Sequence, residues 1–166
     1  MEIVFLGIGT NLGNRENNLE QAIARIEEYI GRILKSSSIY ETEPWGFQPK
    51  DEFLNMVVKV ETTLTPSGLL GRILMIESLL GRVRGQKQYI SRLIDIDILL
   101  YVDLIVNEES LKIPHPLLHD RKFVLVPLCE IASEMIHPVL KKSIADLLEI
   151  CEDKSEVKKY LNTLSP

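Results

Sequence analysis

The chain has 166 residues, of which 45% are hydrophobic and 26% charged, a balance typical of a globular protein with a sizeable core. Its formal net charge of -5 argues against a nucleic-acid binder that works by neutralising many phosphates. We expect a single domain over residues 1–166.

The N-terminus and the two cysteines indicate a cellular compartment. Residues 1–6 carry no basic region and are followed at once by glycines, and no long uncharged apolar run occurs along the chain. Cys129 and Cys151 lie in segments with an apolar or helical pattern, so we interpret them as small core residues that need no disulfide. We therefore expect a cytoplasmic protein.

The first predicted elements are a strand and a helix. Residues 2–9 are rich in Ile, Val, Phe and Leu and predict a buried strand. One of its rows is apolar, whereas the other ends in Gly7 and Gly9, as in a strand that a ligand or another backbone approaches closely. Residues 10–14 predict a turn, and apolar residues at helical spacing then predict a helix that stops at Gly31.

Two further strands flank a loop. Residues 33–42 predict the second strand, and two prolines and a glycine make residues 43–51 a loop. The loop contains Trp45, which either caps the core or lines a site for a flat ligand. Residues 53–62 alternate cleanly, and their Asn55 either complements a lactam or aminopyrimidine edge or bonds a neighbouring loop.

A second helix leads into a basic loop. Thr65 and Pro66 form a strong helix start, and the apolar stripe that follows ends near Gly81. Glu77 lies beside that stripe, where its carboxylate either bonds a ribose hydroxyl or is exposed. Residues 81–92 are basic, contain glycines and have no period, so we expect a mobile loop whose arginines suit an anion.

The segment 92–101 predicts the strand that carries the chemistry. Isoleucine and leucine alternate there with Asp95 and Asp97, so the two carboxylates share one face and repel each other. A hard cation such as Mg²⁺ is the best compensating partner, because carboxylate pairs hold Mg²⁺ against phosphates that the upstream arginines would also bind. The alternative is that both aspartates lie on a solvated sheet face.

The segment after this strand predicts an edge hairpin and a proline turn. Residues 102–113 predict the hairpin, and prolines fix the turn around His115. His115 and His119 have the spacing of zinc ligands on a helix, but no third ligand pattern occurs and the prolines oppose a helix, so we reject a zinc site. Arg121 and Phe123 are candidates for the same anion and ring site as His115.

The C-terminal part predicts two helical segments. Helical turns over residues 124–131 and 143–150 would close the core. Roughly the last fifteen residues are charged, and we expect them to fray.

The order strand, helix, strand, strand, helix, strand predicts the α+β class. We expect the ferredoxin-like split βαβ arrangement, an antiparallel-rich sheet with two helices over one face, together with an edge hairpin and C-terminal helices. The rows that would meet the helices are Val4, Leu6 and Ile8; Leu54, Met56, Val58 and Val60; and Ile94, Ile96, Ile98 and Leu100. The open face would then gather Gly7, Gly9, Phe53, Asn55, Asp95 and Asp97. This predicts a cleft for a flat polar ring beside a metal-bound phosphate.

Several short motifs cover most of the chain. They are Gly7-Ile8-Gly9-Thr10-Asn11-Leu12-Gly13, Tyr40-Glu41-Thr42-Glu43-Pro44-Trp45-Gly46, Phe53-Leu54-Asn55, Gly81-Arg82-Val83-Arg84, Arg92-Leu93-Ile94-Asp95-Ile96-Asp97-Ile98 and Ile113-Pro114-His115-Pro116. Any one of them is weak, but their order and spacing are specific. Together they resemble the 6-hydroxymethyl-7,8-dihydropterin pyrophosphokinases of folate synthesis.

The resemblance implies that ATP and the hydroxymethyl pterin react to give AMP and the pterin diphosphate. It implies two Mg²⁺ ions, held by Asp95 and Asp97. The implied pterin contacts are Thr42, Pro44, Trp45, Phe53, Asn55, Tyr89 and Phe123. The implied nucleotide contacts are Glu77, Arg84, Ile98, His115 and Arg121, with Arg82 and Arg92 also at the phosphates. Asp97 is the candidate base, although metal ligation lowers a carboxyl pKa.

The chain departs from the family in two places. Gln88, Tyr89 and Ile90 stand where the family usually has a basic residue, a large aromatic and glycine, and Phe53 replaces a tyrosine. Gln88 removes a phosphate contact, so we expect activity with a slower chemical step, while Tyr89 can still cover the pterin.

Two alternatives belong to other functional classes. A ferredoxin-like nucleic-acid binder should carry aromatics on its central strands and net positive charge, and this chain has neither beyond Phe53. A catalytically silent relative would bind nucleotide or pterin without releasing AMP. We expect small-molecule substrates, no nucleic-acid or membrane partner, and a monomer.

Overall fold

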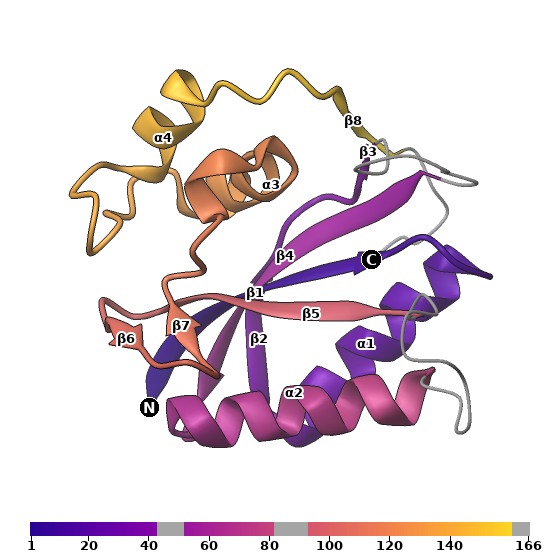
Figure 1. The fold of residues 1–166 in the computed structure, drawn as a ribbon. Coiled ribbons are helices and arrows are strands. Elements are labelled where there is room, and N and C mark those ends of the chain that lie inside the picture. The colour runs from indigo at the N-terminus through magenta and orange to yellow at the C-terminus, as the bar shows by residue number, and fades with distance from the viewer. Residues whose placement is uncertain (43–51, 82–92, 161–166) are drawn as a thin grey trace.

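The computed structural model describes residues 1–42, 52–81 and 93–160, which form a mixed α+β fold (Figure 1). The helices in these residues are α1 (Arg15–Tyr29), α2 (Pro66–Leu80), α3 (Lys122–Ala132) and α4 (Ile144–Ile150), with a 3-10 turn, η1, at Leu118–Asp120. The six strands of the sheet are β1 (Glu2–Thr10), β2 (Gly31–Ser36), β3 (Tyr40–Thr42), β4 (Phe53–Thr62), β5 (Asp95–Tyr101) and β8 (Val157–Lys159). A separate hairpin joins β6 (Val106–Asn107) to β7 (Lys112–Ile113).

The sheet is antiparallel and runs in the order β5-β1-β4-β3-β8, with β2 also paired to β4. Strands β1 and β4 are therefore central, and β5 lies beside β1. Helices α1 and α2 cover one face of the sheet, and α3 and α4 lie over the other face at one end (Figure 1). One end of that second face is thus left without a helical cover.

Alternation explains the larger core. The predicted apolar rows of β1 and β4, and Ile94, Ile96 and Ile98 of the third row, pack with α1 and α2. On the opposite face, Phe5, Val57 and Leu99 pack with α3 and α4. The sheet is consequently buried on both faces where α3 lies above it.

Leu100 was predicted in the row with Ile98, and this prediction is wrong. The register between β1 and β5 shifts, so that Leu6 pairs with Ile98 and Phe5 with Leu100, and Leu99 is the extra residue. A bulge of this kind reverses the alternation beyond it. Leu99 and Leu100 therefore both pack in the core beneath α3.

The predicted second strand, residues 33–42, is two strands. β2 ends at Ser36 and β3 begins at Tyr40, and the Ser37 hydroxyl accepts a hydrogen bond of 2.9 Å from the Val57 amide between them. Gly31, predicted as a helix stop, is the first residue of β2. A Cβ there would lie 2.0 Å from the Glu61 carbonyl oxygen, so the backbone of β4 passes too closely for any other residue.

Part of the C-terminal segment that was predicted to fray is a strand, and residues 161–166 of that segment lie outside the described residues. Residues Val157–Lys159 form β8, which pairs with β3 instead of fraying. The predicted hairpin and the two predicted C-terminal helices are present as β6, β7, α3 and α4. Cys129 and Cys151 are free thiols of intermediate burial.

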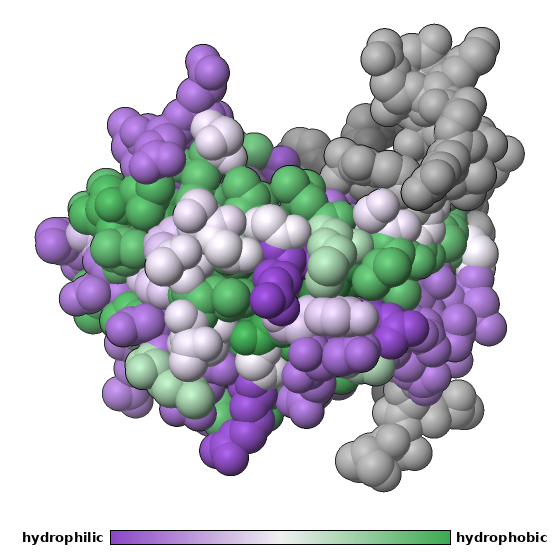
Figure 2. All heavy atoms as spheres, turned by 90° about the horizontal axis from the view of Figure 1, so that it is seen from below, coloured by the Kyte–Doolittle hydropathy of each residue, from purple (hydrophilic) through white to green (hydrophobic). Residues whose placement is uncertain are grey.

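The face formed by α1 and α2 carries exposed apolar side chains (Figure 2). Leu74 and Leu79 of α2 are 48% and 58% exposed. No helix among the described residues is both long enough and apolar enough to span a bilayer.

Candidate active site on the open end of the sheet

A cavity of about 260 Å³ opens on the sheet face that α3 and α4 partly cover, at the end that these helices leave open. This face is called the upper face below. Its lining comes from four strands and from the start of α3. The lining residues are Gly7, Ile8, Gly9, Thr42, Phe53, Asn55, Met56, Val57, Asp95, Asp97, Leu99, Arg121, Phe123 and Val124. All six residues that the sequence predicted on the open face are therefore together in one cavity.

The floor of the cavity is made by the glycines of β1. Gly9 pairs with Asn55 on one side and with Asp95 on the other, and Gly7 pairs with Val57 and Asp97. A Cβ at Gly9 would lie 2.9 Å from the Asn55 Oδ1 atom, closer than a real contact allows. The Asn55 amide can therefore occupy this space only because residue 9 has no side chain.

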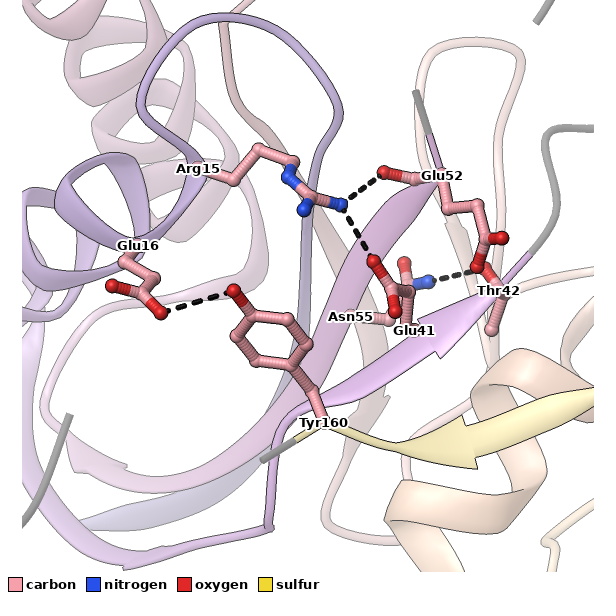
Figure 3. Close-up of polar contacts among 7 residues, drawn as sticks. All are labelled: Arg15, Glu16, Glu41, Thr42, Glu52, Asn55 and Tyr160. Atoms are coloured by element: carbon pink, nitrogen blue, oxygen red, sulfur yellow. Dashed lines mark hydrogen bonds and ion pairs between the residues drawn. The ribbon is translucent and has the colours of Figure 1, made fainter. Parts of the chain in front are cut away.

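The Asn55 amide is held in one orientation (Figure 3). Its Nδ2 atom donates a hydrogen bond of 2.8 Å to the Thr42 hydroxyl, and both residues are buried. This bond uses one of the two N–H groups of the amide. An oriented amide that carries both a donor and an acceptor can read the edge of a heterocycle, and Phe53 and Phe123 supply apolar ring surface in the same cavity.

Asp95 and Asp97 lie on the cavity face of β5, and both are exposed. Two carboxylates beside a glycine floor fit Mg²⁺, which takes few protein ligands and completes its shell with water and phosphate oxygens. Across the three described stretches, no group of three or more His, Cys, Asp or Glu side chains is arranged to hold a metal ion. The donor set therefore suits a cation that arrives with substrate phosphates better than a closed structural site.

Arg121, Phe123 and His115 border the carboxylates. The Arg121 guanidinium lies over the Phe123 ring, 5.5 Å from its centroid. The His115 amide donates to the Leu99 carbonyl at 3.0 Å, and its Nδ1 atom accepts from the Leu117 amide at 3.1 Å. Burial lowers the pKa of the His115 imidazole; the Asp97 carboxylate opposes this shift and the Arg121 guanidinium adds to it. Burial thus favours the neutral form of this imidazole, which lies near a cation and a carboxylate.

Three predicted nucleotide contacts, Glu77, Ile98 and His115, do not line the cavity, and two of them lie on the opposite face of the sheet. Glu77 is only 5% exposed, so the alternative of surface exposure is excluded, and its Oε2 atom accepts a 2.8 Å hydrogen bond from the Ile96 amide. The Ile98 side chain is buried in the core against the helices. Both side chains lie beneath β5, on the face opposite the cavity.

Both ends of α3 are held by hydrogen bonds, and Glu130, near its C-terminal end, contacts the sheet. The Glu130 carboxylate accepts bonds from the Ser38 amide, the Ser38 hydroxyl and the Tyr40 hydroxyl at 2.9, 2.8 and 2.8 Å. Burial and the nearby Glu130 carboxylate raise the pKa of Tyr40 to about 12. At the start of α3, the Lys122 amide donates to the Asp153 carboxylate at 2.9 Å. These contacts fix the helix that carries Phe123.

Six predicted site residues lie outside the described residues: Pro44, Trp45, Arg82, Arg84, Tyr89 and Arg92. The departures at Gln88 and Ile90 also lie there.

Sequence reasoning missed the polar residues at the start of α1. Arg15 bonds β3 and the residue before β4, and Asn18 donates to the Leu12 carbonyl at 2.7 Å and to the Thr10 hydroxyl at 3.0 Å. The Thr10 hydroxyl in turn donates to the Leu93 carbonyl, two residues before Asp95. One signal was available for Arg15, because a cation in the first turn of a helix opposes the helix dipole and so indicates a specific partner.

The family model and the most similar relatives agree on one protein family. The sequence model of 7,8-dihydro-6-hydroxymethylpterin-pyrophosphokinase (HPPK) matches residues 5–133. The chain is 41% identical over 146 residues to the 2-amino-4-hydroxy-6-hydroxymethyldihydropteridine pyrophosphokinase of Aquifex aeolicus (strain VF5), covering 88% of this chain and 90% of the relative. It is 40% identical over 134 residues to the protein of the same name from Bacillus subtilis (strain 168), covering 80% of each.

A solved structure shares the fold. The crystal structure of wild-type Plasmodium falciparum HPPK-DHPS matches with a TM-score of 0.74 at 21% sequence identity. The match covers 89% of this chain and 44% of the Plasmodium chain, so this chain spans less than half of that protein.

Proposed function

The chain belongs to the 7,8-dihydro-6-hydroxymethylpterin-pyrophosphokinase family, and from that premise we propose how its cavity residues share the reaction. The enzyme transfers the diphosphate group of ATP to hydroxymethyldihydropterin in folate synthesis, EC 2.7.6.3. The observation that carries the proposal is that one cavity contains an oriented amide, two aromatic rings and two carboxylates.

The pterin would bind at the Asn55 end of the cavity. Asn55 would pair with the polar edge of the ring system, oriented by Thr42, and the rings of Phe53 and Phe123 would pack against its faces. Pro44, Trp45 and Tyr89 complete the proposed set from the sequence resemblance.

The nucleotide would bind at the β5 side. Arg121 and His115 lie near Asp97 and would contact ATP, with Arg84 at the phosphates. β5 is the first strand in the sheet order, so the backbone of Ile98 offers hydrogen-bonding groups at a strand edge although its side chain is buried. Glu77 would act through the backbone of β5, which it bonds at Ile96.

Asp95 and Asp97 would hold two Mg²⁺ ions, which when bound neutralise the charge of the phosphates. Arg82 and Arg92 would orient the β- and γ-phosphates, so that the pterin hydroxyl meets the β-phosphorus in line. Asp97 would accept the proton of that hydroxyl. These roles require placement and charge neutralisation and involve no covalent enzyme intermediate.

We also propose the wider setting of the enzyme. The strand order supports a ferredoxin-like split βαβ core formed by β1, α1, β2, β4, α2 and β5. We propose a single pyrophosphokinase domain over residues 1–166 that acts as a cytoplasmic monomer with ATP and the pterin as partners.

The carboxylate assignment is tested by Asp95→Asn and Asp97→Asn. Each substitution keeps the size of the side chain but removes the charge that would hold Mg²⁺, so AMP release at saturating substrates should fall by at least about a hundredfold. Circular dichroism should show an unchanged fold. AMP release near the wild-type rate in either variant would remove that carboxylate from the mechanism.

A further inference from the structure

The first turn of α1 lies beside the strand ends that form the pterin side of the cavity (Figure 3). Arg15, the first residue of α1, is half-buried, and its Nη1 atom donates to the Glu41 carboxylate at 3.1 Å and to the Glu52 carbonyl at 2.7 Å. Glu41 is in β3, and Glu52 immediately precedes β4. One guanidinium group therefore links two strands that are adjacent in the sheet.

The linked positions are next to cavity residues on both strands. Thr42 follows Glu41 and pairs with Phe53, which follows Glu52. Thr42 also accepts the hydrogen bond that orients the Asn55 amide. A change in the separation of the two strand ends would therefore move the Thr42 hydroxyl relative to Asn55.

The other edge of β3 is tied to the same helical turn. Tyr160 follows β8, which pairs with β3, and its hydroxyl donates to the Glu16 carboxylate at 3.0 Å. The Tyr160 ring lies under the Arg15 guanidinium, which is 5.8 Å from the ring centroid. The Tyr160 amide also donates to the Ile39 carbonyl at 2.8 Å. Arg15 is thus held from a second direction while it holds β3.

Its position makes Arg15 unfavourable for the helix itself. A cation in the first turn faces the positive end of the helix dipole. The gain must come from the two charge-assisted hydrogen bonds to Glu41 and Glu52, which are stronger than neutral ones. Since neither acceptor belongs to α1, the residue serves the sheet edge.

We propose that Arg15 is a positioning residue for the pterin side of the cavity: it fixes the ends of β3 and β4 and thereby the Thr42–Asn55 pair. The proposal rests on the proposed placement of the pterin at Asn55. Arg15 does not line the cavity itself, so its effect is transmitted through the strands.

The test compares Arg15→Gln with Arg25→Gln. Arg25 is in the same helix and pairs with Glu28 on the surface, with side chains 38% and 51% exposed, so the control makes the same change of charge away from the cavity. Arg15→Gln should raise the KM and the Kd of the pterin about tenfold, while the KM of ATP changes less than about twofold. Arg25→Gln should leave all three values unchanged.

Two further variants test the route of the effect. Arg15→Lys retains a cation with several donors and should restore most of the pterin affinity. The double variant Arg15→Gln with Glu41→Gln should bind pterin no worse than Arg15→Gln alone, because the shared bond is already lost. Unfolding midpoints measured for all of these variants show that each is folded at the assay temperature.

The outcomes separate this inference from the proposed site. Unchanged pterin affinity in Arg15→Gln, or an equal rise in the KM of ATP, overturns the positioning role. Asn55→Ala tests the pterin placement independently: if it leaves pterin affinity unchanged, the placement fails and the inference fails with it. Loss of affinity in Asn55→Ala but not in Arg15→Gln removes only the inference.

Discussion

At the scale of single residues, the floor of the cavity depends on an absent side chain. Gly9 lies between Asn55 and Asp95, with the Asn55 Oδ1 atom only 2.9 Å from where a Cβ would be. The neighbouring Gly7 is less restricted, since a Cβ there would meet the Leu99 side chain at 3.4 Å. A side chain at Gly9 would thus collide with the Asn55 amide, whereas one at Gly7 would only touch Leu99, although the two glycines look equivalent in the sequence.

Gly9→Ala should weaken pterin binding about tenfold, because the added methyl group displaces the Asn55 amide from its bond with Thr42. Titration of the protein with the pterin in the presence of a non-hydrolysable ATP analogue measures the effect. Gly71→Ala is the control, because it makes the same substitution at an exposed position of α2. Wild-type affinity in Gly9→Ala would show that the amide moves without consequence.

The residues that the sequence identified share one property. Asp95, Asp97, Asn55 and the glycines stand out because each interrupts a strand pattern, and alternation alone then assigns them to one face. Arg15 stands out only as a cation in the first turn of a helix, and its two acceptors could not be identified because they lie 26 and 37 residues away in the chain. Contacts of this kind depend on how the strands are paired, which local pattern does not encode.

At the scale of elements, the sequence predicted where helix α2 begins better than it predicted strand register and the short strand β8. Thr65 and Pro66 begin α2 as predicted, with the Gly68 amide donating to the Thr65 hydroxyl at 3.1 Å. The bulge at Leu99 could not be predicted, because it exists only relative to the register of β1. β8 has only three residues, and it forms because it pairs with β3, which is more than a hundred residues earlier in the chain.

Helix α2 contains a position where stability can be raised. Gly71 is exposed, and a Cβ there would meet no atom within 4 Å. Gly71→Ala should therefore stabilise the protein by about 0.5–1 kcal/mol, since alanine loses less backbone entropy than glycine in a helix. Urea unfolding measures the change, and a free energy of unfolding at or below the wild-type value would contradict it.

At the scale of the whole molecule, the layers are unequal. Helices α1 and α2 pack under β1, β2 and β5 on one face of the sheet, whereas α3 and α4 cover only one end of the other face (Figure 1). The apolar upper residues Phe5, Val57 and Leu99 are buried under α3, and the glycine floor lies beyond it. Partial covering thus allows one sheet to contribute to a stable core and to an accessible cavity.

Global stability should fall in mild acid because of His137. The residue is 4% exposed, and its Nδ1 atom accepts bonds from the Val139 and Leu140 amides at 3.2 and 3.0 Å. Burial lowers the pKa of His137, and His119 adds to the effect. The unfolded chain therefore takes up a proton first, and the free energy of unfolding declines as pH falls below about 6.5.

Urea unfolding at several pH values checks this dependence. His137→Asn offers an oxygen to the same amides without a titrating ring, so its free energy of unfolding should decline less than that of the wild type between neutral and mildly acidic pH. Parallel curves for the two proteins would assign the acid sensitivity to other groups.

Glu77 connects the underside of the sheet to the chemistry above it. Its carboxylate bonds the amide of Ile96, the residue between Asp95 and Asp97, so the helix layer anchors the backbone that carries the two acidic groups. Substitutions in a hydrophobic core on the sheet face opposite an active site are easily assumed to affect stability alone. Here, a library that randomises the contact between α2 and β5 would alter turnover together with thermostability, so Glu77 should be kept constant in such a library.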